Sequence, residues 1–208
     1  MNLKKLLFET DSVISELDSY LIKIIHIIKS NQLGNKKIRK STSAFIEIND
    51  FCFDSDALLN YLSFLRNNLN QAIEYTENQI SHFRQKRENL EHKYTIYKGL
   101  ELLLQKTSNP TKIRYAMYSA YGESWEEFIE LSTLEILDEM DYGRSFSSKL
   151  YRNIEQVLDT FTSNSTPISE VDKNIKFYSM LRDDIPQYME DLNNRIKIIC
   201  YLRKKAVA

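Results

Sequence analysis

The longest helical pattern in the chain covers residues 54–106, which read DSDALLNYLSFLRNNLNQAIEYTENQISHFRQKRENLEHKYTIYKGLELLLQK. This stretch contains no proline, and Gly99 near its end is its only glycine. Asp54 suits the N-cap position and Asp56 the first turn, where the positive end of the helix dipole favours a carboxylate. We therefore predict one continuous helix, about 75 Å long at about 1.5 Å per residue.

A heptad repeat of apolar residues runs along this predicted helix for more than six heptads, with one extra step of four residues near Leu69. Such a helix is expected to pair with another long helix, within the chain or in a second molecule. Two seam positions, Arg87 and Glu101, are charged. Their side chains either lie at the edge of the seam, with the aliphatic part packed and the charge in solvent, or they pair with opposite charges on the partner helix. The seam positions are Leu58, Leu62, Leu65, Leu69, Ile73, Thr76, Ile80, Phe83, Arg87, Leu90, Tyr94, Tyr97, Glu101 and Leu104.

A second long apolar stripe follows Thr166 and Pro167, which suit an N-cap and the first helical position. Pro186 interrupts this stripe, so we predict two helices that meet near Asp183 and Asp184, or one kinked helix. The stripe is the natural partner of the long helix, and the two would form an antiparallel hairpin with smaller helices packed between its ends. The predicted segments are an N-terminal core helix and basic loop (1–53), the long coiled-coil helix (54–106), a small helical lobe (107–165) and C-terminal long helices (166–208).

Within the other segments, apolar periodicity predicts a helix from about Asp11, or earlier, to Ser30. Residues 44–53 are ambiguous between strand and helix, and residues 112–121 favour a helix. Ser124 and Glu127 have the spacing of a capping box, which predicts a helix that begins there. The fold class is therefore all-α, an elongated helical bundle built on a long coiled-coil hairpin, and one short strand pair is compatible with it.

The composition agrees with long helices and excludes several classes of protein. Only 4 Gly and 3 Pro are present, so the tight turns of all-β and Rossmann-type folds are scarce. A net charge of -1 gives no field over the whole molecule that would attract nucleic acid. Cys52 and Cys200 lack metal-ligand spacing and suit small buried hydrophobes in a reducing compartment, with a disulfide between them as the alternative. The apolar stretch 20–28 is interrupted by charge, so we expect no membrane span and a cytoplasmic protein.

The histidines offer little catalytic chemistry. His82 and His92 are ten residues apart and would point in different directions on one helix, so no metal site, cofactor or catalytic residue is assigned. Residues 87–92 read RENLEH, and this Arg-four-His spacing resembles the motif of the HEPN ribonuclease superfamily, which is all-helical and often dimeric. The resemblance implies an alternative function, a helical ribonuclease or toxin that uses Arg87 and His92 across a dimer.

Two charged segments could bind a ligand. The basic run Lys36, Lys37, Arg39 and Lys40 could contact the phosphates of nucleic acid or lipid, although such a run is more often a solvated loop. An acidic face, which we interpret as solvated because it lacks the pattern of an EF-hand loop, consists of Glu126, Glu127, Glu130, Glu135, Asp138 and Glu139.

The sequence therefore favours a non-enzymatic protein-protein interaction module, such as a subunit, adaptor or assembly factor, which acts through its coiled-coil seam. Its partner would be another protein or a second copy of itself, since the many tyrosines combine contact area with low entropy cost. The alternatives are the ribonuclease and a phosphate-binding or nucleic-acid-binding accessory that uses residues 36–40.

Overall fold

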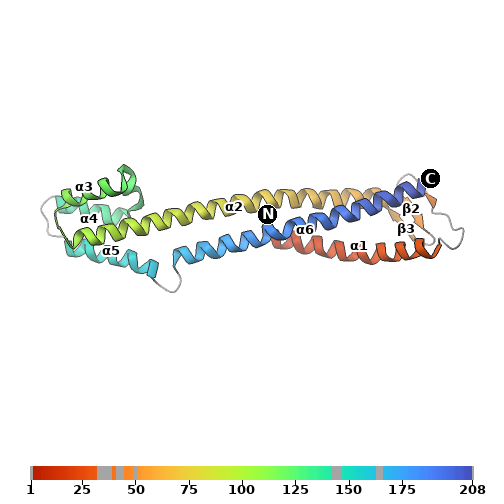
Figure 1. Ribbon diagram of the computed structural model, residues 1–208, viewed down its shortest axis with the longest axis horizontal. Coiled ribbons are helices and arrows are strands. Elements are labelled where there is room, and N and C mark those ends of the chain that lie inside the picture. The colour runs from red at the N-terminus through yellow and green to blue at the C-terminus, as the bar shows by residue number, and fades with distance from the viewer. Residues whose placement is uncertain are drawn as a thin grey trace. The chain divides into compact units, whose positions relative to one another are not determined.

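The computed structural model describes residues 2–31, 39–40, 45–48, 51–141, 147–162 and 166–207, and it describes side chains in 2–22, 54–140, 148–162 and 166–204. These residues form six α-helices, one 3₁₀-helix and three short strands (Figure 1). The elements are α1 (Leu3–Asn31), β1 (Arg39–Lys40), β2 (Phe45–Ile48), β3 (Phe51–Asp54), α2 (Ser55–Leu104), α3 (Pro110–Tyr121), η1 (Glu123–Phe128), α4 (Leu131–Asp141), α5 (Ser147–Thr162) and α6 (Pro167–Val207). The predicted all-α class is confirmed.

The chain divides into two compact units. Unit 1 comprises Met1–Asn78 and Tyr178–Ala208, and unit 2 comprises Gln79–Phe177, so the long helices α2 and α6 contribute residues to both. No helix among the described residues is long and apolar enough to cross a membrane.

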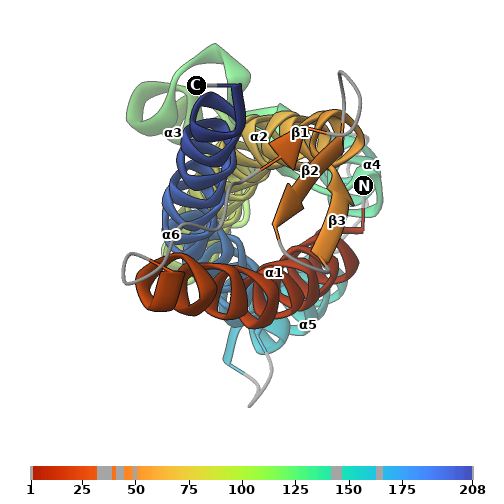
Figure 2. The same ribbon diagram turned by 90° about the vertical axis from the view of Figure 1, so that its right-hand side faces the viewer.

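Unit 1 is a bundle of three helices, α1, α2 and α6, which lie side by side in both views (Figure 1 and Figure 2). Asp56 in the first turn of α2 pairs with Arg203 near the end of α6 at 2.7 Å. Further along α2, Tyr75 meets Tyr178, which lies earlier on α6, with ring centroids 6.3 Å apart. The two helices are therefore antiparallel, and the predicted hairpin is confirmed. Its core draws on all three helices, namely Leu3, Leu6, Ile14, Leu17 and Leu21, then Leu62, Leu65, Leu69 and Ala72, then Ile185, Leu192, Ile199 and Leu202.

A small antiparallel sheet joins α1 to α2, with strand order β1-β2-β3. Instead of one strand pair the chain forms a three-stranded sheet, and of the ambiguous residues 44–53 it includes 45–48 and 51–53 as strands. The chain passes directly from β3 into α2, because the Asp54 carboxylate accepts hydrogen bonds from the backbone N–H groups of Asp56 and Ala57, both at 3.0 Å. The N-cap thus supplies a hydrogen-bond acceptor for two backbone N–H groups of the first turn, which have no acceptor within the helix.

Unit 2 packs α3, η1, α4 and α5 around the second half of α2. Its core includes Ile96, Tyr97 and Leu100 of α2, and Trp125 of η1 is buried there. Asn109 caps α3 by accepting a hydrogen bond from the N–H of Lys112 at 3.0 Å, with Pro110 in the first turn. The predicted helix over 112–121 is therefore present, and it ends at Gly122, whose φ of 83° is a conformation that side chains disfavour.

One local prediction is wrong, since the residues after Ser124 form the 3₁₀-helix η1 and the next α-helix begins only at Leu131. At Pro186 the structure has one of the two predicted alternatives, a single helix, because Pro186 lies inside α6. Pro186 is exposed while Ile185 and Leu192 are fully buried, so the missing hydrogen bond lies on the solvent side and apolar burial holds the helix together.

Candidate protein-interaction surface

The heptad seam of α2 is occupied by the protein's own helices. Every one of its positions from Leu58 to Leu104 is buried or half-buried. In unit 1, Leu62, Leu65 and Leu69 belong to the core shared with α1 and α6. In unit 2, Tyr97 belongs to the core shared with α3, α4 and α5. The surface that a partner could reach therefore lies on other faces of the helices.

Arg87 forms an ion pair across the seam within one chain. Its Nε lies 2.9 Å from Oδ1 of Asp172 on α6, and its Nη2 lies 3.0 Å from Oε1 of Glu91, one turn later on α2. The second charged seam position, Glu101, pairs with Lys98 at 2.9 Å, and this hydrogen bond raises the pKa of Lys98. Of the two interpretations given for these charged seam positions, Arg87 fits the pairing across the seam, because Asp172 belongs to the opposite helix. Glu101 does not, because Lys98 lies on the same helix.

Arg87 and His92 contact different elements. The exposed His92 ring lies edge-on to Phe128 of η1, with centroids 4.5 Å apart, and it also approaches Tyr121 of α3 at 6.5 Å. Arg87 is directed to α6 by Asp172. One chain therefore does not bring the two side chains of the Arg-four-His motif together. Among the described residues there is also no group of His, Cys, Asp and Glu that could hold a metal ion.

The basic run is only partly within the described residues. Lys36 and Lys37 lie outside them, and Arg39 and Lys40 form strand β1, where the backbone alone is described. Of the two cysteines, Cys200 is a half-buried free thiol on α6, and the side chain of Cys52 lies outside the described set.

A buried polar chain that the sequence did not reveal connects α2 with α4 and α5. The hydroxyl oxygen of Tyr97 accepts a hydrogen bond from the backbone N–H of Glu130 at 3.0 Å. It also lies 3.0 Å from the Thr133 hydroxyl, which donates to Oδ1 of Asn153 at 2.5 Å. Because the single hydrogen of Thr133 is used on Asn153, the Tyr97 hydroxyl must be the donor to Thr133. Each hydroxyl therefore donates once, and we call this chain the Tyr97 clamp.

Four of the six carboxylates of the acidic face form ion pairs that join elements of unit 2, the fourth being Glu139 with Lys149 of α5. Arg114 of α3 pairs with Glu126 of η1 at 2.6 Å and also with Asp138 of α4. Lys93 of α2 pairs with Glu130 at 2.8 Å. The paired carboxylates therefore hold α2, α3, η1, α4 and α5 in place. Because three basic side chains serve four of the six carboxylates, the face keeps a net negative charge.

Large apolar side chains are exposed beside these carboxylates. Tyr115 and Tyr118 on α3 are 75% and 51% exposed, and Leu131 at the start of α4 is 71% exposed. Arg114 on α3 pairs with Asp138 on α4. Tyr118 lies one turn after Arg114 on the same face of α3, and Leu131 lies two turns before Asp138 on the same face of α4. We call Tyr115, Tyr118 and Leu131 with the surrounding carboxylates the lobe surface.

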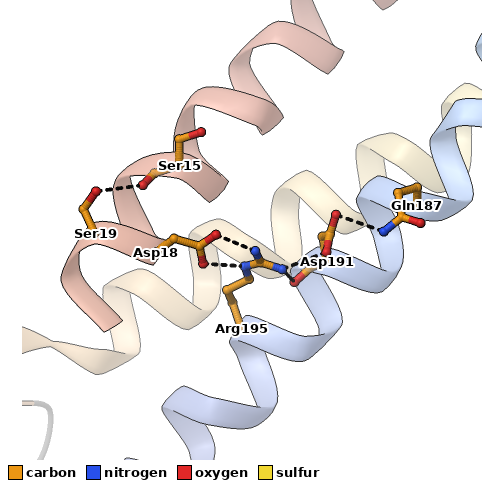
Figure 3. A network of polar contacts seen from close by, with 6 residues as sticks. All are labelled: Ser15, Asp18, Ser19, Gln187, Asp191 and Arg195. Carbon is orange, nitrogen blue, oxygen red and sulfur yellow. Dashed lines mark hydrogen bonds and ion pairs between the residues drawn. The ribbon is translucent and has the colours of Figure 1, made fainter. Parts of the chain in front are cut away.

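Unit 1 contains a polar network of a different kind, shown in Figure 3. Arg195 of α6, only 15% exposed, forms a two-pronged pair with Asp18 of α1 through Nε at 3.0 Å and Nη2 at 2.7 Å. Its Nη1 donates to the side chain and carbonyl of Asp191, both at 2.9 Å. The hydrogen bond with Asp18 is the main cause that raises the pKa of Arg195. All three nitrogens are thus satisfied, and the network fixes α1 against α6 rather than forming an open site.

The chain matches no protein-family model, and neither a curated protein nor a solved structure shows significant similarity to it.

Proposed function

We propose that this protein is a non-enzymatic helical interaction module, a subunit, adaptor or assembly factor, whose lobe surface binds a basic face of another protein. The observation that carries the proposal is the exposure of three large side chains in unit 2, Tyr115 and Tyr118 on α3 and Leu131 at the start of α4. Tyrosine and large apolar side chains on a polar rim are the composition of interface centres.

The charge around these side chains supports a basic partner. Residues 110–141 carry eight acidic residues but only two basic ones, Lys112 and Arg114. Lys93 and Lys149 pair with Glu130 and Glu139 from outside this range, and with them the acidic residues still outnumber the basic ones by eight to four, so the field that the lobe surface presents is negative. A partner with lysine or arginine around an apolar centre would be complementary to it, and like-charged partners would be disfavoured.

The occupied seam supports the same assignment. Because the seam side chains pack against α1, α6 and the small helices, a partner that used the seam would have to displace them. The lobe surface can be covered without unfolding either core.

Quantitative affinity capture with the full chain tests the proposal. The bait series consists of the wild type, the lobe variant Tyr115→Ser/Leu131→Ser, and a matched control, Phe8→Ser/Phe64→Ser, which removes two exposed aromatic side chains of unit 1. Burying one such side chain contributes about 1.5–3 kcal/mol, so the lobe variant should bind its partner at least about tenfold more weakly. The control should retain it.

Two results would count against the proposal. If the wild type and the lobe variant capture the same proteins in the same amounts, the lobe surface is not the binding face. If the purified protein cleaves RNA and His92→Ala abolishes the cleavage, the ribonuclease alternative replaces the interaction module.

A further inference from the structure

Two tyrosine rings from opposite arms of the antiparallel hairpin meet in unit 1. Tyr75 lies on α2 and Tyr178 on α6, their ring centroids are 6.3 Å apart, and the two ring planes are inclined by 69°. This edge-to-face arrangement is that of aromatic rings in direct contact. Both side chains are half-buried, so small solutes can reach them from one side.

The two phenol hydroxyls also lie close together. Burial is the main cause that raises the pKa of Tyr178, and a hydrogen bond with the Tyr75 side chain is the second. The hydroxyl is the only polar group of a tyrosine side chain, so this hydrogen bond joins the two phenol oxygens. The ortho carbons of a phenol lie directly beside the carbon that carries the hydroxyl. The ortho carbons of the two rings are therefore held near one another.

The packing around the pair keeps the two rings together. Ala72 and Thr76, on either side of Tyr75 in α2, are fully buried. Ile185 of α6 is fully buried in the unit 1 core, against which both tyrosines pack. Groups that are held side by side react with each other at a far higher effective concentration than free molecules reach. A reaction between Tyr75 and Tyr178 is thus favoured over a reaction of either ring with another molecule.

Neighbouring phenols have a characteristic reaction with one-electron oxidants. A phenol that loses one electron and its hydroxyl proton becomes a phenoxyl radical, in which the unpaired electron is shared between the oxygen and the ortho carbons. Two such radicals couple through their ortho carbons when these carbons can meet.

We propose that Tyr75 and Tyr178 form an oxidative modification site, at which a peroxide-driven one-electron oxidant joins the two rings as dityrosine and locks α2 to α6. Each phenol gives up one electron and one proton, and hydrogen peroxide takes up both electrons and both protons and leaves as two molecules of water. The new carbon–carbon bond joins one ortho carbon of each ring. The hydrogen atom on each of these carbons then moves to the phenol oxygen, which restores both hydroxyls. The proposal is independent of the function of the lobe surface.

The cross-link would stabilise the hairpin. It closes a loop of about 100 residues, and a covalent link of this span lowers the conformational entropy of the unfolded chain. Because the link joins α2 directly to α6, the two helices cannot separate while it is present. Oxidised unit 1 should therefore unfold at a higher urea concentration than untreated unit 1.

Photo-oxidation of the full chain tests the proposal. The protein receives a short light pulse at low concentration with tris(bipyridine)ruthenium and persulfate, a small one-electron oxidant in which persulfate takes the place of hydrogen peroxide. The monomer is then isolated on a sizing column and digested. Trypsin releases Tyr75 in the peptide 67–84 and Tyr178 in the peptide 177–182, and neither peptide contains another tyrosine. We expect the monomer to yield these two peptides joined, with a mass two hydrogen atoms below their sum, and to show dityrosine fluorescence.

Variants and a denatured sample separate this site from the other tyrosines. Tyr75→Phe and Tyr178→Phe should each lose the joined peptides and most of the dityrosine fluorescence of the monomer, because phenylalanine forms no phenoxyl radical. Tyr188→Phe is the matched control, since Tyr188 is another half-buried tyrosine of α6 in unit 1, and it should leave both signals unchanged. Wild-type protein that is oxidised in urea, after unfolding, should lose most of the joined peptides because the rings are then apart.

Stability supplies the second measurement. In urea unfolding followed by circular dichroism, the cross-linked wild type should have a higher midpoint than the untreated protein, whereas oxidised Tyr75→Phe should not. If a variant fails to fold, the comparison of native and unfolded wild type decides the question. The proposal is overturned if the native wild type yields no joined peptides, or if it yields no more of them than the unfolded protein. Joined peptides without a higher midpoint would refute the lock.

Discussion

Replacing Tyr97 with phenylalanine removes one oxygen atom from the middle of the Tyr97 clamp and leaves the packing of the ring unchanged. Tyr97 is fully buried, and its hydroxyl both accepts from the N–H of Glu130 and donates to Thr133. The variant loses a net hydrogen bond worth about 1 kcal/mol, and it leaves a partly buried N–H without its partner, which costs about 1–3 kcal/mol. We expect unit 2 to lose about 2–4 kcal/mol of unfolding free energy.

The chain provides its own probe for this measurement. Trp125 is the only tryptophan, it is 2% exposed, and it lies in the core of unit 2, so its fluorescence in a urea titration follows the unfolding of that unit. Tyr94→Phe is the matched control, because Tyr94 is half-buried and its ring packs on Phe161 with centroids 5.5 Å apart. The control should change the free energy by less than about 0.5 kcal/mol.

A double-mutant cycle with Thr133→Val identifies the interaction itself. If the Tyr97 and Thr133 hydroxyls are linked, the two substitutions together should cost about 1 kcal/mol less than the sum of their separate effects. The reasoning is refuted if Tyr97→Phe is as mild as Tyr94→Phe, or if the two effects in the cycle are additive.

Three further predictions concern stability. Asp18→Asn should cost unit 1 about 1 kcal/mol in urea unfolding followed by circular dichroism, because it weakens the paired acceptor of a buried guanidinium, whereas Glu9→Gln, in an exposed pair at 3.6 Å, should cost about 0.3 kcal/mol. Gly99→Ala should destabilise unit 2, since the new Cβ would lie 2.5 Å from the Tyr121 hydroxyl, but the same change should stabilise it by about 1 kcal/mol when Tyr121→Ala has removed that ring. Burial and the nearby carboxylates of Asp11 and Asp184 raise the pKa of Tyr188 in the folded protein. The neutral Tyr188 hydroxyl therefore adds to the free energy of unfolding fully below pH about 10, and this stability is lost as the pH rises beyond it. In urea titrations at alkaline pH, Tyr188→Phe should lose less stability with rising pH than the wild type.

The elements that follow from local patterns could be predicted from the sequence. The heptad repeat predicts a helix over 54–106, close to the observed Ser55–Leu104, and Asp54 and Thr166 cap their helices as their residue types suggest. The antiparallel pairing of the two long helices also follows, because no other stripe in the chain is long enough to cover the seam.

The features that depend on distant residues could not be predicted. Tyr97 has the spacing of an ordinary seam position, and its partners Glu130 and Thr133 lie more than thirty residues away, so no local pattern marks the clamp. A proline interior to a helix is usually disruptive, and only the burial on both sides of Pro186 shows why α6 continues. The exposure of the lobe surface could not be predicted either, because in a short helix the sequence pattern does not distinguish exposed apolar residues from buried ones.

The account depends on the seam of α2 being closed within one chain, and the absolute mass of the purified protein by light scattering behind a sizing column tests this most directly. We predict a mass near 24.6 kDa, the mass of one chain, across the whole range of concentrations. A stable dimer that Leu90→Glu converts to a monomer would contradict the account, because the seam would then join two molecules and the interaction surface would have to be sought along α2.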